Sequence, residues 1–407
     1  MSAPEKSDVD LYVGPDALAI DVWDRYSVRL SMLEVGLPFL FNFWHSNMGR
    51  SAWGLLTGTV GRIKCGHVVT LALDGDAVLS GLVDTLDVGD GDFGRGEPIL
   101  AISGRDALGP AVSGDADPTL TLEGRRLSDA IAAVYQGVGI TPDIGESVDP
   151  SAVVSRLRRR AVRRGRAHAS TLRNDAVKAS HPRVGERAHQ VVERMCKQLG
   201  YRVWTTPVEG SGRTGVIVDR PRSGGAPSHT LRRELDVSGR VTDRSQIRWG
   251  KERTSNAAVP TAVTVFGDKE RGDSPAAKVA REVTNGFLLT DAALQRVVID
   301  PPPQPRYLQS RDATTEAGAH NEAARVCAQA NEGFRRYDCG VLGHRIEGKL
   351  LLPNQVVLLT DDVVGIAGER WLIVDVEYTG DRSQDQRTRL SMVPEGALTI
   401  IPETAPT

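Results

Sequence analysis

Apolar and polar residues alternate in short runs over much of the chain, and the segment from Ile63 to Arg105 shows this pattern most clearly. In its first two runs, four residues alternate with outward-facing partners: Val68, Thr70, Ala72 and Val78. The sequence between these runs, Asp74-Gly75-Asp76, is typical of a tight turn. A third run, 81–88, leads through a loop rich in glycine and aspartate into a fourth run, 99–103. The pattern predicts a four-strand antiparallel meander.

The residues before this meander continue the β pattern. Residues 11–22 and 26–35 alternate as strands and are followed by the densest group of aromatic residues in the chain: Phe39, Phe41, Phe43 and Trp44. We interpret this group as a strand that fills a β core, and the alternative is a platform on which a ligand stacks. Together these runs predict a first β-domain that ends near residue 112.

A change of period marks the next part of the chain. Apolar residues recur at helical spacing between Leu127 and Val138, which predicts one helix with a buried stripe. A second helix begins after Gly185-Glu186, buries its own stripe and ends at Gly200. Two strands of a hairpin follow, at 201–207 and 215–221. We therefore expect a mixed middle region over 113–250, with a helix-hairpin unit at 183–221.

The last part of the sequence returns to the β pattern and contains one predicted helix. Residues 257–267 begin it, and a helix rich in small residues is expected over 316–334. Strands are then expected at 337–347, 355–359, 370–378 and 387–392, separated by turns. The predicted fold class is α+β and mainly β, with β-domains at 1–112 and 251–400 on either side of the middle region.

Composition and charge exclude several classes of protein. Lys plus Arg number 50 and Asp plus Glu 52, so no overall charge bias favours nucleic acid or an anionic membrane. The four cysteines form no Cys-x-x-Cys pair, which argues against a zinc site or a disulfide framework. The N-terminal sequence is polar and acidic, and no run of about 18 apolar residues occurs. We expect a soluble protein without a membrane span, made in a reducing compartment and not exported by the usual secretory route.

One segment carries a concentrated positive charge. Residues 155–168 contain seven arginines, Arg156, Arg158, Arg159, Arg160, Arg163, Arg164 and Arg166. Their spacing spreads charge around a helix, so the segment is expected to be solvated or docked on an acidic partner. It could track nucleic-acid phosphates, form salt bridges with another subunit, or serve as a flexible linker.

Two glycine-rich motifs resemble nucleotide-binding loops but lack the context that this chemistry needs. Residues 210–215 spell GxGxxG, yet the loop opens onto an expected strand instead of a helix whose N-terminus meets a pyrophosphate. Residues 343–349 spell GxxxxGK, but Leu350 follows where a P-loop needs a Ser or Thr hydroxyl for magnesium. Neither motif predicts a bound nucleotide.

Other catalytic and metal patterns are also missing. The sequence contains neither GxSxG nor HExxH, and its eight histidines show no metal-ligand spacing. An acidic loop with Asp84, Asp87, Asp90 and Asp92 offers oxygen ligands for calcium but lacks the register of an EF-hand. A carboxylate pair for glycoside cleavage needs no fixed spacing in the sequence, and no residue is singled out for it. We therefore predict no cofactor, no metal and no enzymatic activity.

Three blocks of the sequence resemble the baseplate hub proteins of contractile-tailed phages such as Mu, the late-control D family. The first is Ile63-x-x-Gly66-x-x-Val69 with Asp74-Gly75-Asp76-x-Val78-Leu79-Ser80-Gly81-x-Val83-Asp84 and Ile102-Ser103-Gly104-Arg105-Asp106. The second is Val184-Gly185-Glu186 with its helix and hairpin. The third runs from Arg311-Asp312 through Gly343-His344, Gly348-x-Leu350-x-x-Pro353, Val357, Asp361 and Gly365-Ile366 to Trp371-Leu372-Ile373. Together they cover most of the chain in the family's order, whereas residues 155–180 and 44–59 depart from its pattern.

The resemblance implies a mechanical role. Such hubs are trimers in which each subunit contributes two tube-like antiparallel β-barrels, so that six similar modules form a ring. One face of the ring matches the sixfold tail tube, the other seats the threefold central spike, and an axial channel would let DNA pass. The implied partners are the spike, the tail tube or distal tail protein and other baseplate proteins, in a virion tail baseplate assembled in the host cytoplasm.

We expect the subunit or partner contacts at two turns and at the arginine segment: Asp74, Gly75, Asp76, Asp361, Asp362, Arg156, Arg158, Arg159, Arg160, Arg163 and Arg164. Two other functions stay open at this point. One is a nucleic-acid-binding protein that uses the arginine segment, with affinity that depends steeply on salt. The other is a hub-associated cell-wall hydrolase.

Overall fold

The computed structural model describes most of the chain and leaves the arginine segment outside the described residues. It describes residues 7–14, 18–20, 23–43, 63–88, 100–145, 148, 154–155, 177–178, 181–197, 199–208, 213–255, 259–268, 278–284, 304–310, 316–381 and 386–399. Within these ranges, no helix is both long enough and apolar enough to cross a membrane.

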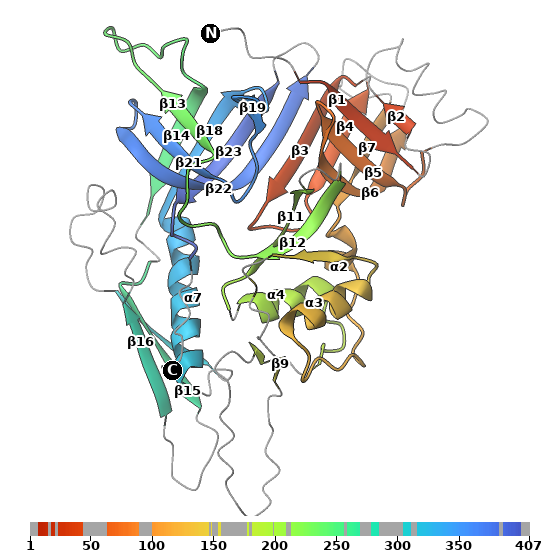
Figure 1. Ribbon diagram of the computed structural model, residues 1–407, viewed down its shortest axis with the longest axis vertical. Helices are drawn as coiled ribbons and strands as arrows, with labels where there is room; N and C mark the ends of the chain where they lie inside the picture. Colours follow the sequence, from red (N-terminus) through yellow and green to blue (C-terminus); the bar gives the residue numbers. More distant parts are fainter. Residues whose placement is uncertain are drawn as a thin grey trace, which may run out of the picture.

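A 13-stranded sheet dominates the structure and contains strands from both ends of the chain (Figure 1). Its main path runs β14 (Ile247–Thr254), β18 (Arg335–Leu342), β23 (Arg387–Pro394), β22 (Ile366–Asp381), β3 (Arg25–Ser31), β4 (Pro38–Phe43), β7 (Leu100–Asp106), β6 (Asp76–Val88), β5 (Val68–Leu73), β1 (Val9–Val13) and β2 (Leu18–Ile20). Two further strands, β13 (His229–Arg233) and β21 (Val356–Asp361), pair with each other, and β21 also pairs with β22. The expectation of a mainly β protein with antiparallel strands is confirmed.

The two halves of this sheet repeat one pattern of strand pairing. In the first half, strands pair in the order β3-β4-β7-β6-β5, and in the second half the order is β14-β18-β23-β22-β21. The register agrees as well, because two equivalent rows of neighbouring residues cross the strands: Val28, Phe39, Gly104 and Val83 in the first half, and Glu252, Tyr337, Met392 and Ile373 in the second.

Local details of the repeat match closely. The β6–β7 pair has a bulge between Val83 and Thr85, and the β22–β23 pair has one between Ile373 and Asp375. Val83 exchanges backbone hydrogen bonds with Gly66 and His67, at 2.7 and 2.9 Å. Ile373 makes the same two bonds, both 2.9 Å, with Asn354 and Gln355. Gly66 and Asn354 both adopt a positive φ, at 87° and 66°, so the turn before β5 has the same shape as the turn before β21.

Pairing between β3 and β22 joins the two halves. Residues 25–31 run antiparallel to 375–381, and Leu30 lies opposite Val376, where both side chains are fully buried. One continuous hydrophobic core therefore extends under both halves, from Val9 to Met392. The sheet forms one surface instead of two separate ones, and closed tube-like barrels stay a prediction.

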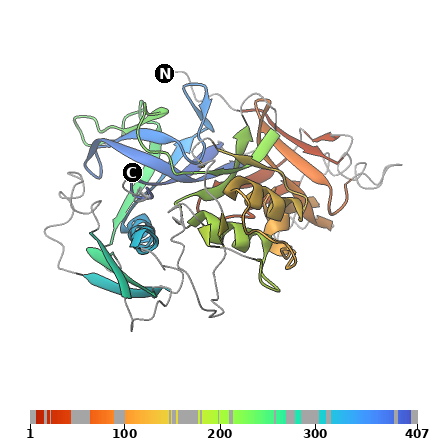
Figure 2. The ribbon, with the colours of Figure 1, turned by 60° about the horizontal axis from the view of Figure 1, so that its bottom comes forward.

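The middle region forms a second layer against the large sheet. Strands β11 (Arg202–Val208), β12 (Arg213–Asp219) and β8 (Pro142–Ile144) form a small sheet, and α2 (Gly109–Ser113), α3 (Leu127–Gln136) and α4 (Ala188–Lys197) lie on its far side (Figures 1 and 2). Trp204 packs against Leu372 and Val374 of the large sheet, whereas Val216 and Val218 face the helices. The predicted apolar stripes of both helices are buried against the small sheet and against each other.

A third unit surrounds the long helix α7 (Glu316–Phe334), which matches the predicted helix residue for residue. Strands β15 (Ala262–Asp268), β16 (Lys278–Thr284) and β17 (Pro305–Ser310) form a sheet of their own. Ala319 and Ala323 pack against Val263 and Val265, because small side chains let the helix lie close to the strands. The remaining short strands are β9 (Val154–Ser155), β10 (Val177–Lys178), β19 (Arg345–Ile346) and β20 (Lys349–Leu350).

The strands of the large sheet cross the domain division expected from the sequence. β13 and β14 fall within 113–250, yet they pair with β21 and β18 of the C-terminal part. The division into 1–112, 113–250 and 251–400 therefore stays a prediction, and the β3–β22 pairing makes the outer two parts contiguous.

The predicted four-strand meander has only three strands, which is a correction. The second and third runs are one strand, β6, because Gly81 continues the strand instead of ending it. A Cβ on Gly81 would lie 2.1 Å from the Arg105 carbonyl oxygen, so glycine lets β7 approach closely. The inward register of the first run was also wrong by one residue: Val69, Leu71 and Leu73 are buried, and Val68 is 57% exposed. Val78 of the second run is buried as expected. Phe39 and Phe41 are buried as expected, whereas Trp44 lies outside the described residues.

We predict that Gly81→Val destabilises the protein by about 1–3 kcal/mol, because the new side chain would overlap backbone atoms of β7 that cannot move. The midpoint of urea unfolding measures the change. Gly333→Ala is the matched control: this glycine lies in α7 with open space around it, so alanine should be neutral or stabilising by up to about 1 kcal/mol. Equal midpoints for both variants would contradict the close-approach explanation.

Candidate functional site

Charged side chains cover the outer face of the sheet where its two halves meet. Asp375 of β22 binds Arg336 of β18 at 2.6 Å and lies 3.7 Å from Arg29 of β3. Glu377 accepts from Arg389 of β23 at 3.3 Å. Glu377 and Arg389 lie directly opposite each other on neighbouring strands, whereas Asp375 connects β22 to β3 and, across β23, to β18. Opposite charges on facing strands stabilise a sheet.

A shallow cavity of about 630 Å³ lies on this face, across β14, β18, β23, β22 and β3. Trp249 on β14 is 42% exposed there, and the Arg389 guanidinium lies 5.7 Å from the centre of its ring. A tryptophan held by a cation and left partly open to solvent is typical of a surface that contacts another protein.

The turn between β5 and β6 contacts the other half of the same chain. Arg345 of β19 binds Asp74 at 2.8 Å and Asp76 at 2.6 Å, and also donates to the Leu73 carbonyl at 3.0 Å. Burial would raise the pKa of the Asp74 carboxyl. Hydrogen bonds from the Arg345 side chain, the Asp8 backbone and Ser7 outweigh this effect and lower the pKa. The structure thus places Asp74, Gly75 and Asp76 at an internal contact, and their role toward another subunit stays a prediction.

The second predicted turn divides into a buried and an exposed residue. Asp361 is fully buried, where it accepts a hydrogen bond from the Tyr337 hydroxyl and lies 3.6 Å from Arg233. Asp362 is exposed and accepts from the Leu235 amide at 3.1 Å. Of these two residues, only Asp362 has an exposed side chain. Arg156, Arg158, Arg159, Arg160, Arg163 and Arg164 lie outside the described residues, so the predicted role of the arginine segment stays a prediction.

A buried histidine sits between the two halves. The Thr388 hydroxyl donates to the Gly343 carbonyl at 2.6 Å, so it accepts from His344 Nδ1 at 2.9 Å. This leaves His344 Nε2 as the acceptor for the hydroxyl of Tyr26 on β3. Burial lowers the pKa of His344 to about 4, and the ring is therefore neutral at physiological pH. The neutral ring completes a hydrogen-bond chain across the junction.

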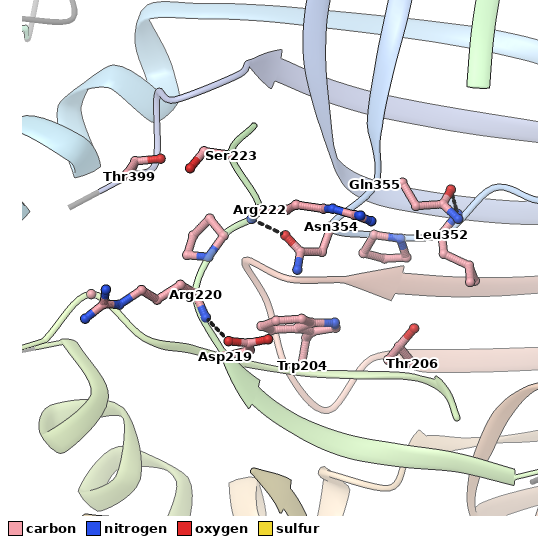
Figure 3. Close-up of a pocket in the computed structure, with 13 residues that line it drawn as sticks. Trp204, Thr206, Asp219, Arg220, Arg222, Ser223, Leu352, Asn354, Gln355 and Thr399 are labelled. Atoms are coloured by element: carbon pink, nitrogen blue, oxygen red, sulfur yellow. Dashed lines mark hydrogen bonds between the residues drawn. The ribbon is translucent and has the colours of Figure 1, made fainter. Parts of the chain in front are cut away.

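The cleft in Figure 3 lies where the middle layer meets the large sheet. It encloses about 640 Å³ and is lined by β11, β12 and the turn at 352–355. The Arg222 amide donates to Asn354 at 2.6 Å, which ties the two layers together. Among the described residues that line it, Asp219 is the only carboxylate, and its oxygen accepts from the Arg220 amide at 2.8 Å. The lining thus offers no paired acid and base for hydrolysis.

Of the four aspartates in the acidic loop, the structure describes Asp84 and Asp87. Asp84 binds Arg105 at 2.6 Å, while Asp90 and Asp92 lie outside the described residues. In the part of the chain that the structure describes, no three His, Cys, Asp or Glu side chains gather as metal ligands. The GxGxxG loop opens onto β12, and the GxxxxGK motif spans the β19–β20 hairpin, so both contexts expected from the sequence are confirmed.

No family model matches the sequence, and no curated protein matches it. Solved structures do. The tail protein of Neisseria meningitidis MC58 is similar with a TM-score of 0.70 at 17% identity, covering 99% of this chain and 100% of that one. The 43-kDa tail protein of prophage MuSo2 from Shewanella oneidensis gives 0.68 at 16% identity, covering 96% and 99%. The chain has the fold of phage tail proteins.

A longer chain of known structure is also similar to this protein. A chain of the half-lidded Francisella PdpA–VgrG complex is similar with a TM-score of 0.53 at 8% identity, covering 100% of this chain and 61% of that one. The similarity therefore covers this whole chain and part of the longer one.

Several residues that hold the phage tail fold together gave no signal in the sequence. Arg335 is fully buried at the start of β18, where it binds Glu252 at 2.5 Å and Glu369 at 2.7 Å. Its guanidinium lies 4.8 Å from the ring centre of Trp371. In the sequence, Arg345 stands out only as part of a glycine motif, and His344 only in that motif and in the family resemblance. The partners of all three come from distant parts of the chain, so no local spacing reveals them.

We predict that the protein loses stability as the pH falls from about 6.5 to about 4, and that His344 contributes about 3 kcal/mol to this loss. The pKa of His344 is lower in the folded protein than in the unfolded chain, so between these pH values only the unfolded chain binds the proton. Proton binding therefore shifts the equilibrium toward the unfolded state as the pH falls. Burial also lowers the pKa values of His189 and His229. These two residues should therefore leave part of the pH dependence of stability in place when His344 is replaced.

His344→Asn should flatten the dependence of the unfolding midpoint on pH between 4 and 6.5. The exposed His181→Asn serves as the matched control and should leave the dependence unchanged. Equal slopes for wild type and His344→Asn would contradict the neutral, buried histidine.

Proposed function

We propose that this chain is a structural protein of the baseplate of a contractile phage tail or a related injection system. In this proposal three copies form a hub ring that joins the sixfold tail tube to the threefold central spike. The observation that carries it is the repeat: one chain holds two copies of the same strand pattern in one sheet. Three chains would then present six similar units around one axis.

Similarity over the whole length supports the tail assignment. The similarity covers almost the full length of both tail proteins. The spike contact is suggested by the Francisella complex of PdpA and VgrG. The proposed partners are therefore a central spike, a tail tube or distal tail protein and other baseplate proteins, and the proposed location is the virion tail baseplate.

A purely structural role fits the side chains better than catalysis does. Several described charged residues of the sheet, among them Asp375 and Glu377, are paired with arginines of other strands, and the cleft at 352–355 has one carboxylate among its described lining residues. Ion pairs between strands fix geometry, which is what a ring that carries load needs.

We predict that the purified full-length chain is a trimer. Light scattering should give the mass of three 43.9-kDa chains, about 132 kDa, and a larger complex when a candidate spike protein is added. A monomer in both conditions would contradict the hub and favour the nucleic-acid alternative.

A further inference from the structure

The pairing of β3 with β22 has an equivalent in the repeat, and the two strands that would form this second pair do not pair with each other within the chain. By the repeat, β14 occupies the position of β3, and β6 occupies the position of β22. In β22, residues 366–372 pair with β21, and residues 375–381 continue past it to pair with β3. In β6, residues 76–82 pair with β5, and residues 85–88 continue past it in the same way. Each chain therefore fills one such junction internally.

Both strands that would form the second junction are open. Among the described residues, no strand pairs with Thr85–Val88 on the side away from β7, and β14 pairs only with β18. Thr85, Asp87 and Arg253 are exposed, and Leu86 is half-buried against the core. In the filled junction the residues equivalent to Leu86 and Thr254 are Val376 and Leu30, and both are fully buried.

We propose that β14 of one chain pairs antiparallel with residues 85–88 of β6 in a second copy of this chain. The inference rests on the proposed ring, and it names the strands and the register that close it. Copying the register of the β3–β22 pair places Ser255 opposite Thr85, Thr254 opposite Leu86, Arg253 opposite Asp87, and Glu252 opposite Val88.

Charge supports this register. Arg253 faces Asp87 in the same way that Arg29 faces Glu377 in the filled junction. A slip of β14 by one residue would place Arg253 on the face of the sheet opposite to Asp87. Opposite charges directly across two strands are stabilising, whereas like charges are not.

Backbone geometry identifies where a cross-link will form. The Met32 amide donates to the Val374 carbonyl at 3.0 Å, so this pair is hydrogen-bonded. By alternation Arg29 and Glu377 form a non-hydrogen-bonded pair, in which Cα atoms approach to about 4.5 Å. In the proposed register, Arg253 and Asp87 form the equivalent non-hydrogen-bonded pair. Within one chain β14 and β6 are separated by six strands, so a disulfide between them has to join two chains.

Cysteine cross-linking of the full-length chain tests the proposal. Arg253→Cys and Asp87→Cys are introduced together with Cys65→Ser, because Cys65 is the exposed native thiol in the described residues. After mild oxidation, a denaturing gel without reductant should show covalent dimers and trimers of the double variant, and only monomers of each single variant. Arg29→Cys with Glu377→Cys is the matched control: it reproduces the filled junction and should close a disulfide within the monomer.

The outcomes separate this inference from the proposed ring. A trimer by light scattering that yields no covalent oligomer overturns the proposed pairing but leaves the ring intact. A monomer by light scattering overturns both. Covalent oligomers in the single variants would show that the thiols meet without the proposed register, and would also overturn it.

Charge exchange provides a second test that needs no oxidation. Arg253→Asp and Asp87→Arg should each lower the fraction of trimer at a fixed concentration, because each places like charges opposite each other. The double exchange should restore the trimer. Losses that simply add in the double variant would contradict the direct pairing of the two residues.

Discussion

The antiparallel pairing of β3 with β22 is the constraint on which the rest of the structure depends. It joins residues about 350 positions apart in the sequence, and it makes one core out of two groups of strands. Other contacts gather around it: Tyr26 on β3 reaches His344, and Arg345 holds the β5–β6 turn. A shift of this register by one residue would turn either Leu30 or Val376 away from the core. Burial of both side chains therefore fixes the register.

Strand length explains how the junction is built. β22 has 16 residues and β6 has 13, more than twice the length of the strands that precede them, β21 and β5, with six each. A bulge after Ile373 or Val83 separates the part that pairs within a half from the part that extends beyond it. Bulges bend a strand and increase its twist, and each long strand can in this way serve two neighbouring units.

Local features of the fold could be predicted from the sequence, whereas the junction could not. Helix α7 and the stripes of α3 and α4 follow from short-range periodicity, and the C-terminal strands follow from turns that bound them. The register of β5 was missed because Leu71, Ala72 and Leu73 are all buried, which hides the alternation. The β3–β22 pairing and the ion pairs of Arg335 and Arg345 depend on distant residues, and no local pattern encodes them.

The internal junction also determines which strands stay available. β3 reaches β22 within its own chain, where the effective concentration far exceeds that of another molecule. Each chain then keeps one strand of each kind, β14 and the end of β6, at different places on the sheet. A contact between two different surfaces is head-to-tail, so it continues from chain to chain until the rotation closes a ring. Charged residues on β14, such as Lys251 and Arg253, oppose pairing with unrelated strand edges, because edge charges disfavour aggregation. In the proposed pairing, the same charges favour an edge that carries Asp87.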